Sequence, residues 1–109
     1  MALRRGQLYW AVLDKRRPAL VVSPDYRNDR ASDVIVVPTS TVLREAPTHV
    51  RLRRGEGGVR VPSVLKCEQV TTLHQSSLDP RPLGGSLSVT RMAEVERAIL
   101  RAIGVPVPL

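Results

Sequence analysis

The fold is decided by the stretch Arg16-Arg17-Pro18-Ala19-Leu20-Val21-Val22-Ser23-Pro24-Asp25. Its apolar centre is rich in valine and bounded by prolines, a pattern typical of a buried strand. Pro18 has no amide proton, so we expect it at the first position of that strand, and it forces Arg17 into an extended conformation. The sequence therefore predicts a guanidinium at the start of a central strand, where its planar, permanent charge suits a phosphate. A solvated charge pair ahead of a core strand is the simpler interpretation.

Length and charge limit the kinds of protein to consider. The 109 residues predict a single domain, 1–109, with one modest core. The net charge is +7, and only Lys15 and Lys66 of the 17 basic residues are lysine. This balance favours a polyanionic partner, with nucleic acid ahead of an anionic membrane.

The single cysteine, Cys67, excludes an internal disulfide and a cysteine-cluster metal site. We expect it to be a small core residue. No signal peptide and no membrane-spanning stretch can be recognised, which predicts a cytoplasmic protein. The sequence indicates no metal and no cofactor.

Further strands are predicted from β-branched and alternating apolar residues at 7–13, 33–41, 48–53 and 69–73, with short apolar pieces at 59–61 and 63–67. Pro38 within the second of these implies an edge strand, a bulge or the strand's end. Residues 26–32 are expected to form a loop or one helical turn, and 55–58 a flexible turn.

A helix is predicted over residues 89–103. Ser88 is a plausible N-cap, and an apolar stripe runs through Val89, Met92, Val95, Ile99 and Ile103. Gly104 and Pro106 end it. Several short strands followed by one packed helix predict a mostly β, α+β domain: a small barrel or a curved antiparallel sheet.

The usual catalytic motifs are absent from the sequence. A histidine pair can cleave RNA by general acid–base transfer, but His49 and His74 each lie in a strand-like segment with no evident acidic partner. We therefore interpret His49 as a residue that faces RNA or a second subunit. Thr39, Ser40 and Thr41 offer three hydroxyls at a strand end, where capping is the simpler role.

Taken together, several segments in order resemble the MazF/PemK toxin family. They are Arg5-Gly6 with Tyr9-Trp10 and Leu13, Arg17–Ser23, Asn28, Val34–Ser40, Pro47–Val50, Ser63–Leu65 and Glu68–Val70. The resemblance implies a small SH3-like β-barrel fold of the CcdB and MazF type, acting as a homodimer. It implies a metal-independent endoribonuclease that cuts single-stranded RNA at short sequences, and a MazE-like antitoxin whose disordered tail blocks the RNA groove.

The resemblance also implies roles for residues. The family's catalytic arginine corresponds to Arg17, and its catalytic threonine to Ser40, with Thr41 as the possible substitute. The set expected to contact RNA is Arg16, Asn28, Thr39, His49, Arg51, Arg53 and Gln69, with Tyr9, Trp10 or Tyr26 available for base stacking. The loop before Arg17 is shorter than in many members.

Two alternatives remain open from the sequence. One is a gyrase-binding toxin like CcdB, which performs no chemistry. The other is an SH3-like RNA-binding module, whose binding would weaken with salt without any cleavage.

Overall fold

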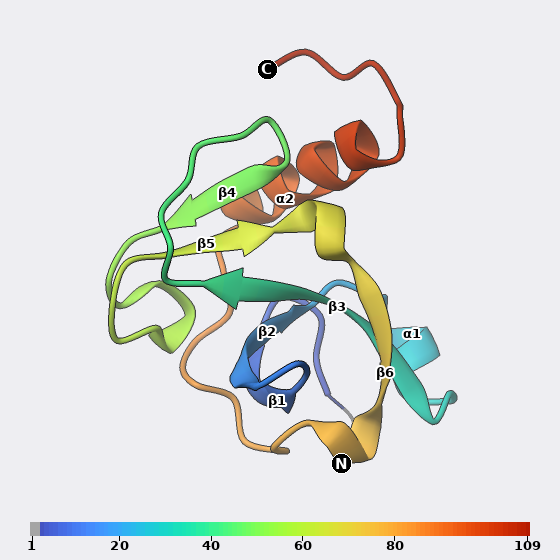
Figure 1. Ribbon diagram of the computed structural model, residues 1–109. Coiled ribbons are helices and arrows are strands. Elements are labelled where there is room, and N and C mark those ends of the chain that lie inside the picture. The colour runs from blue at the N-terminus through green and yellow to red at the C-terminus, as the bar shows by residue number, and fades with distance from the viewer. Residues whose placement is uncertain (1–2) are drawn as a thin grey trace.

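The computed structural model describes residues 3–109 (Figure 1). Its strands are β1 (Leu8–Val12), β2 (Arg16–Val21), β3 (Asp33–Ser40), β4 (His49–Leu52), β5 (Ser63–Lys66) and β6 (Thr71–His74). Its α-helices are α1 (Asp25–Asn28) and α2 (Val89–Ala102), and single 3-10 turns form η1 (Glu56–Gly58), η2 (Cys67–Gln69) and η3 (Gln75–Ser77). Residues 26–32 were expected to form a loop or one helical turn; the helical turn is α1, and a loop follows it.

The strands form one open antiparallel sheet, ordered β1-β2-β3-β5-β4, with β6 also paired to β3. β3 is the longest strand and the centre of the arrangement. One of its edges pairs with β2, and the other pairs first with β6 and then with β5. The prediction of a mostly β fold with a curved antiparallel sheet and a C-terminal helix is confirmed.

The predicted positions of the two strand prolines were wrong. β2 begins at Arg16, and Pro18 lies inside it, opposite Trp10 of β1. Pairing with β3 begins only at Ala19, so the other edge of β2 is open at Pro18. Pro38 does not end β3. It lies between the part paired with β6, which stops at Val36, and the part paired with β5, so no bond to either strand is lost.

Both faces of the sheet are covered, which explains why its strands have nearly continuous apolar sequences. One face packs under α2, around Leu20, Val37 and Val95. The other face holds Tyr9, Val21 and neighbouring residues under the N-terminal segment and Leu78. Cys67 lies in the first core, and burial raises the pKa of its thiol to about 12. Its predicted role as a core residue is confirmed.

α2 ends within one residue of the prediction. The hydroxyl of Ser88 accepts a hydrogen bond from the amide of Arg91 at 3.0 Å, as an N-cap should. The helix packs on β4 and η2 through Met92, Val95 and Ala98. The ends of the predicted stripe are wrong, since Val89 is 88% and Ile103 66% exposed at the two termini of the helix.

The glycine turn at 55–58 contacts two other parts of the chain. Arg91 of α2 donates from Nε and Nη2 to the two carboxylate oxygens of Glu56, at 2.9 and 2.8 Å. Gly58 has φ +91°, and a Cβ there would lie 2.4 Å from the backbone of Leu83. The turn is therefore tied to the helix on one side and to the 79–85 loop on the other.

The predicted strand at 69–73 begins two residues late. Gln69 belongs to η2, a turn that lets the chain leave β5 and return to β3 as β6. Within residues 3–109, no helix has both the length and the apolar character needed to cross a membrane.

Candidate nucleic-acid interface

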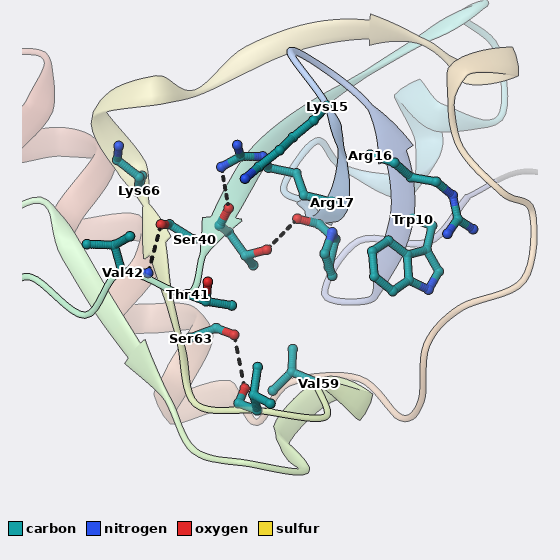
Figure 2. Close-up of a pocket in the computed structure, with 13 residues that line it drawn as sticks. Trp10, Lys15, Arg16, Arg17, Ser40, Thr41, Val42, Val59, Ser63 and Lys66 are labelled. Carbon is teal, nitrogen blue, oxygen red and sulfur yellow. Dashed lines mark hydrogen bonds between the residues drawn. The ribbon is translucent and has the colours of Figure 1, made fainter.

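A hollow of about 450 Å³ opens beside the ends of β2 and β3 (Figure 2). We call it the central hollow. Basic and hydroxyl side chains share its wall with apolar ones: Trp10, Lys15, Arg16, Arg17, Pro18, Thr39, Ser40, Thr41, Val42, Val59, Val61, Ser63 and Lys66. No carboxylate is among these residues, so the positive charges on its wall are suited to an anion.

The strand register brings the two predicted catalytic positions together. β2 and β3 pair Ala19 with Pro38. Continued by two residues toward the start of β2, this register sets Arg17 opposite Ser40. The hydroxyl of Thr39 donates to the carbonyl of Pro18 at 2.7 Å and holds the strands together at this point.

Arg17 is the most constrained cation of the central hollow. Its Nη1 donates to the carbonyl of Thr39 at 3.0 Å, and its Nη2 to Asp14 Oδ2 at 3.0 Å. The side chain is only 17% exposed. Its Nε is buried, and no group in residues 3–109 accepts a hydrogen bond from it. Each Nη uses one of its two protons in these bonds and has a second proton left to donate.

The three hydroxyls have different surroundings. Ser40 Oγ accepts a hydrogen bond from the amide of Val42 at 3.1 Å, which leaves its own proton free to donate. Thr41 is exposed on the wall of the central hollow. Thr39 is buried, and its proton is already used on Pro18. Thr39 therefore serves the strand pairing, and we withdraw it as an RNA contact through its side chain.

Opposite sides of the central hollow carry different chemistry. Arg16 lies over the indole of Trp10, 4.5 Å from the ring centroid. Lys66 stands across from this pair, at the end of β5 (Figure 2). Trp10 faces the hollow, whereas Tyr9 points into the core, as expected for neighbours on a strand. An aromatic surface facing an ammonium can hold a base and a phosphate together.

A second hollow of about 370 Å³ shares Arg17 with the first. It is lined by Leu13, Asp14, Arg17, Pro38, Gln69 and Thr71. Gln69 thus lies near the predicted catalytic arginine, although it belongs to a turn and not to a strand.

Asn28, which was expected to contact RNA, is buried in the structure. The side chain is 1% exposed, donates to the carbonyl of Ser23 at 3.0 Å and accepts from the Ser23 hydroxyl at 2.5 Å. This pair fixes the turn between β2 and α1. Asn28 is a structural residue of that turn.

Three other predicted contacts lie away from the central hollow. Arg51 is exposed beside a hollow formed with Arg44 and Glu45, and Arg53 is exposed after β4. The expectation that His49 has no acidic partner was wrong, since its Nε2 lies 3.1 Å from Glu68 Oε2. Glu68 is distant in sequence but follows β5, the strand that pairs with β4. None of the three side chains lines the described wall of the central hollow.

Sequence reasoning missed several wall residues: Lys15, Val59, Val61, Ser63 and Lys66. Composition does single out Lys66, because it is one of two lysines among the 17 basic residues. Both lysines line this hollow. Residues 59–63 carry no such signal, because only the pairing of β5 with β3 and β4 brings them there. Within residues 3–109, no three His, Cys, Asp or Glu side chains are grouped closely enough to hold a metal ion.

Known proteins share both the sequence pattern and the fold. Residues 4–103 match the family described as PemK-like, MazF-like toxin of type II toxin-antitoxin system. Endoribonuclease MazF3 of Mycobacterium tuberculosis is 31% identical over 97 residues, which cover 89% of this chain and 87% of that protein.

Solved structures of MazF proteins have the same fold as this chain. Mycobacterium tuberculosis toxin MazF-mt6 superposes with a TM-score of 0.83 at 27% identity, covering 93% of this chain and 99% of its own. An endoribonuclease from a mycobacterial species, in complex with its cognate antitoxin, gives 0.83 at 29% identity, covering 98% and 100%. MazE-MazF from Deinococcus radiodurans gives 0.80 at 25%, covering 95% and 97%. The chain belongs to the PemK-like, MazF-like toxins of type II toxin–antitoxin systems.

Proposed function

We propose that this protein is an endoribonuclease toxin that cleaves single-stranded RNA at short specific sequences without a metal ion. The observation that carries the proposal is that Arg17 and Ser40 line one hollow together with Lys15, Arg16 and Lys66. The family membership and the relatives named as endoribonucleases support the same reaction class.

The reaction is an internal transfer within the RNA. The 2′-oxygen bonds to the adjacent phosphorus as it loses its proton, the bond from phosphorus to the 5′-oxygen breaks, and that oxygen gains a proton. The products are a 2′,3′-cyclic phosphate and a 5′-hydroxyl. This route requires a 2′-hydroxyl, so the substrate is RNA and not DNA.

Arg17 stabilises the negative charge that develops on the non-bridging oxygens. The second proton on each Nη is the donor for this purpose, and the bond to Thr39 fixes its direction. Ser40 donates its proton to a phosphate oxygen or to the leaving 5′-oxygen, with Thr41 as the neighbouring hydroxyl. Arg16, Lys66 and Gln69 hold the flanking nucleotides, and Trp10 stacks on a base.

The partners follow from the family. We propose a MazE-like cognate antitoxin, whose acidic segment would occupy the basic hollows and exclude RNA, and a homodimeric toxin acting in the cytoplasm. The antitoxin complexes of the mycobacterial and Deinococcus relatives support the first part. Light scattering of the purified protein tests the dimer, and a mass of one chain would contradict it.

The test of the reaction compares wild type with Arg17→Ala on a defined RNA in the presence of EDTA. We expect wild-type cleavage with a cyclic phosphate end, and a loss of about 10²–10³ in rate for the variant, the effect of removing an oxyanion donor. Arg81→Ala is the matched control, because Arg81 is an exposed arginine in the 79–85 loop. A 2′-deoxy substitution at the cut site should block cleavage. Equal cleavage by wild type and Arg17→Ala would refute the site.

A further inference from the structure

The loop after Ser40, residues 41–48, is joined to the sheet by a continuous series of hydrogen bonds. The Val42 amide donates to Ser40 Oγ at 3.1 Å, and the Arg44 amide donates to the Val42 carbonyl at 3.0 Å. The Arg44 carbonyl in turn lies 3.0 Å from Nδ1 of His49. The series therefore connects a hydroxyl on the wall of the central hollow with a side chain of β4.

The series ends on a carboxylate. His49 Nε2 lies 3.1 Å from Glu68 Oε2, and the Thr48 hydroxyl donates to Glu68 Oε1 at 3.0 Å. The His49 side chain is only 10% exposed. Burial acts to raise the pKa of Glu68, but hydrogen bonds from its own backbone, His49 and Thr48 outweigh it and lower that pKa. The carboxylate is therefore ionised at neutral pH and accepts from His49.

Both ring nitrogens of His49 face groups that only accept hydrogen bonds. The Arg44 carbonyl has no proton to give, and the ionised Glu68 has none either. A neutral imidazole carries one N–H, whereas the imidazolium carries two. Only the imidazolium can make both bonds at once, so loss of one proton breaks the series at His49.

We propose that His49 and Glu68 are positioning residues of the nuclease site, and that doubly protonated His49 holds the 41–48 loop so that Ser40 and Thr41 face the RNA. The inference rests on the proposed function of the site. Neither residue contacts RNA in this assignment, because both act through the hydrogen bonds that fix Ser40. This proposal gives His49 a function in the nuclease site although its side chain does not line the central hollow.

Other charged groups surround His49 on several elements. They are Arg44 and Glu45 in the loop, Arg51 in β4, Lys66 as its cross-strand partner in β5, and Glu94, Arg97 and Arg101 in α2. Among residues 3–109, only Arg44 and Glu68 are hydrogen-bonded to the ring. None of the remaining charges replaces either bond.

The structural part of the test uses nuclear magnetic resonance and needs no RNA. Across a pH series we expect slow amide exchange at Val42 and Arg44 wherever both His49 nitrogens carry protons, and we expect the slow exchange to be lost together with the second proton. In His49→Gln the two amides should exchange faster at every pH. His74→Gln is the matched control, because His74 is exposed and bonded only to nearby Ser76. Unchanged exchange of both amides in His49→Gln would overturn the proposal.

The catalytic part compares kcat with KM across the same pH range. At about pH 6 we expect His49→Gln to lower kcat on the order of tenfold with little change in KM, because a displaced hydroxyl affects the transition state more than binding. Glu68→Gln should behave similarly, and Glu68→Asp should recover part of the rate. The wild-type to His49→Gln ratio of kcat should fall toward one as pH rises.

The structural and the catalytic parts of the test distinguish failure of this proposal from failure of the proposed function. If wild type does not cut RNA, the proposed function is refuted while the amide exchange still decides the hydrogen-bond series. If wild type cuts RNA and His49→Gln keeps its kcat and pH profile, the positioning role is refuted while the nuclease stands.

Discussion

The carbonyl oxygen of Thr39 accepts a hydrogen bond from Nη1 of Arg17 at 3.0 Å, while the hydroxyl of the same threonine donates to the residue after that arginine. One buried residue of β3 thus fixes both the backbone and the head group at the start of β2. The direction of the guanidinium is a property of the strand pairing, and Arg17 is held in place before any ligand arrives.

Thr39→Val tests this arrangement. Valine keeps the shape but leaves the Pro18 carbonyl without its donor, so the free energy of unfolding should fall by about 1–2 kcal/mol. The carbonyl that accepts from Arg17 stays, but the lost bond to Pro18 lets the two strands shift at this point, so kcat should fall roughly tenfold while KM changes little. Chemical denaturation and cleavage kinetics check the two effects. Thr90→Val, on the exposed first turn of α2, should change neither. A variant with wild-type kcat would show that Thr39 does not align Arg17.

Trp10 should report occupation of the central hollow. It is the chain's only tryptophan, so binding of an RNA oligonucleotide should change the intrinsic fluorescence directly. Trp10→Leu should weaken binding roughly tenfold through lost stacking. Tyr26→Leu, which removes an exposed aromatic on α1, is the control and should bind as wild type. Unchanged fluorescence at saturating RNA would show that the bases do not bind at Trp10.

Salt should weaken the same binding, because the Arg and Lys side chains on the wall displace counterions from phosphates. Lys66→Gln should reduce the slope of log affinity against log salt by about one. Lys66 stands across the hollow from Trp10, so the change should leave the fluorescence response itself intact (Figure 2). An unchanged slope would remove Lys66 from the phosphate path.

The ion pair between Glu56 and Arg91 makes stability depend on pH. The hydrogen bonds from Arg91 are the largest cause of the lowered pKa of Glu56 and outweigh the opposing effect of burial. A carboxyl whose folded pKa is lowered stabilises the fold above its unfolded pKa, and this contribution is lost as pH falls toward the folded value. Glu56→Gln should therefore cost about 1 kcal/mol at neutral pH and progressively less below about pH 4.3.

Denaturation of both proteins across that acidic range measures the difference. Glu45→Gln is the matched control, since Glu45 is exposed in the 41–48 loop. A Glu56→Gln penalty that stays constant down to low pH would contradict the ion-pair account.

Gly58→Ala should be strongly destabilising. Its φ of +91° is unfavourable for alanine, and the added Cβ would lie 2.4 Å from the Leu83 carbonyl group. We expect a loss of about 2–3 kcal/mol in the free energy of unfolding, measured by chemical denaturation. Gly85→Ala should be nearly neutral, because no atom lies within 4 Å of its Cβ position. A mild effect at Gly58 would mean that the 79–85 loop moves away easily.

Local pattern in the sequence predicted elements better than contacts between them. The valine-rich stretches gave β2 and β3, and the spacing from Met92 gave α2, because these depend on periods within one segment. Pro18 and Pro38 were placed wrongly because a proline's tolerance depends on which neighbour pairs at that residue, which one strand alone does not reveal.

In the candidate site, too, local sequence predicted some residues, and only contacts between elements reveal the others. Arg17, Ser40 and Thr41 were predicted from motifs next to strand ends, and the structure places all three on one wall. The partnership of His49 with Glu68 joins residues 19 positions apart through the pairing of β4 with β5. Asn28 follows β2 in the family order, but only its bonds to Ser23 reveal that it is an internal support.

The inert state of Cys67 has a practical consequence for observing this protein at work. Thiol-reactive dyes attack thiolates, and a buried thiol with its pKa raised to about 12 offers almost none. A single cysteine introduced at exposed Val42 can therefore be labelled selectively, without first replacing the natural one. A probe at that position would follow the movement of the loop in real time as the toxin meets its substrate or its inhibitor.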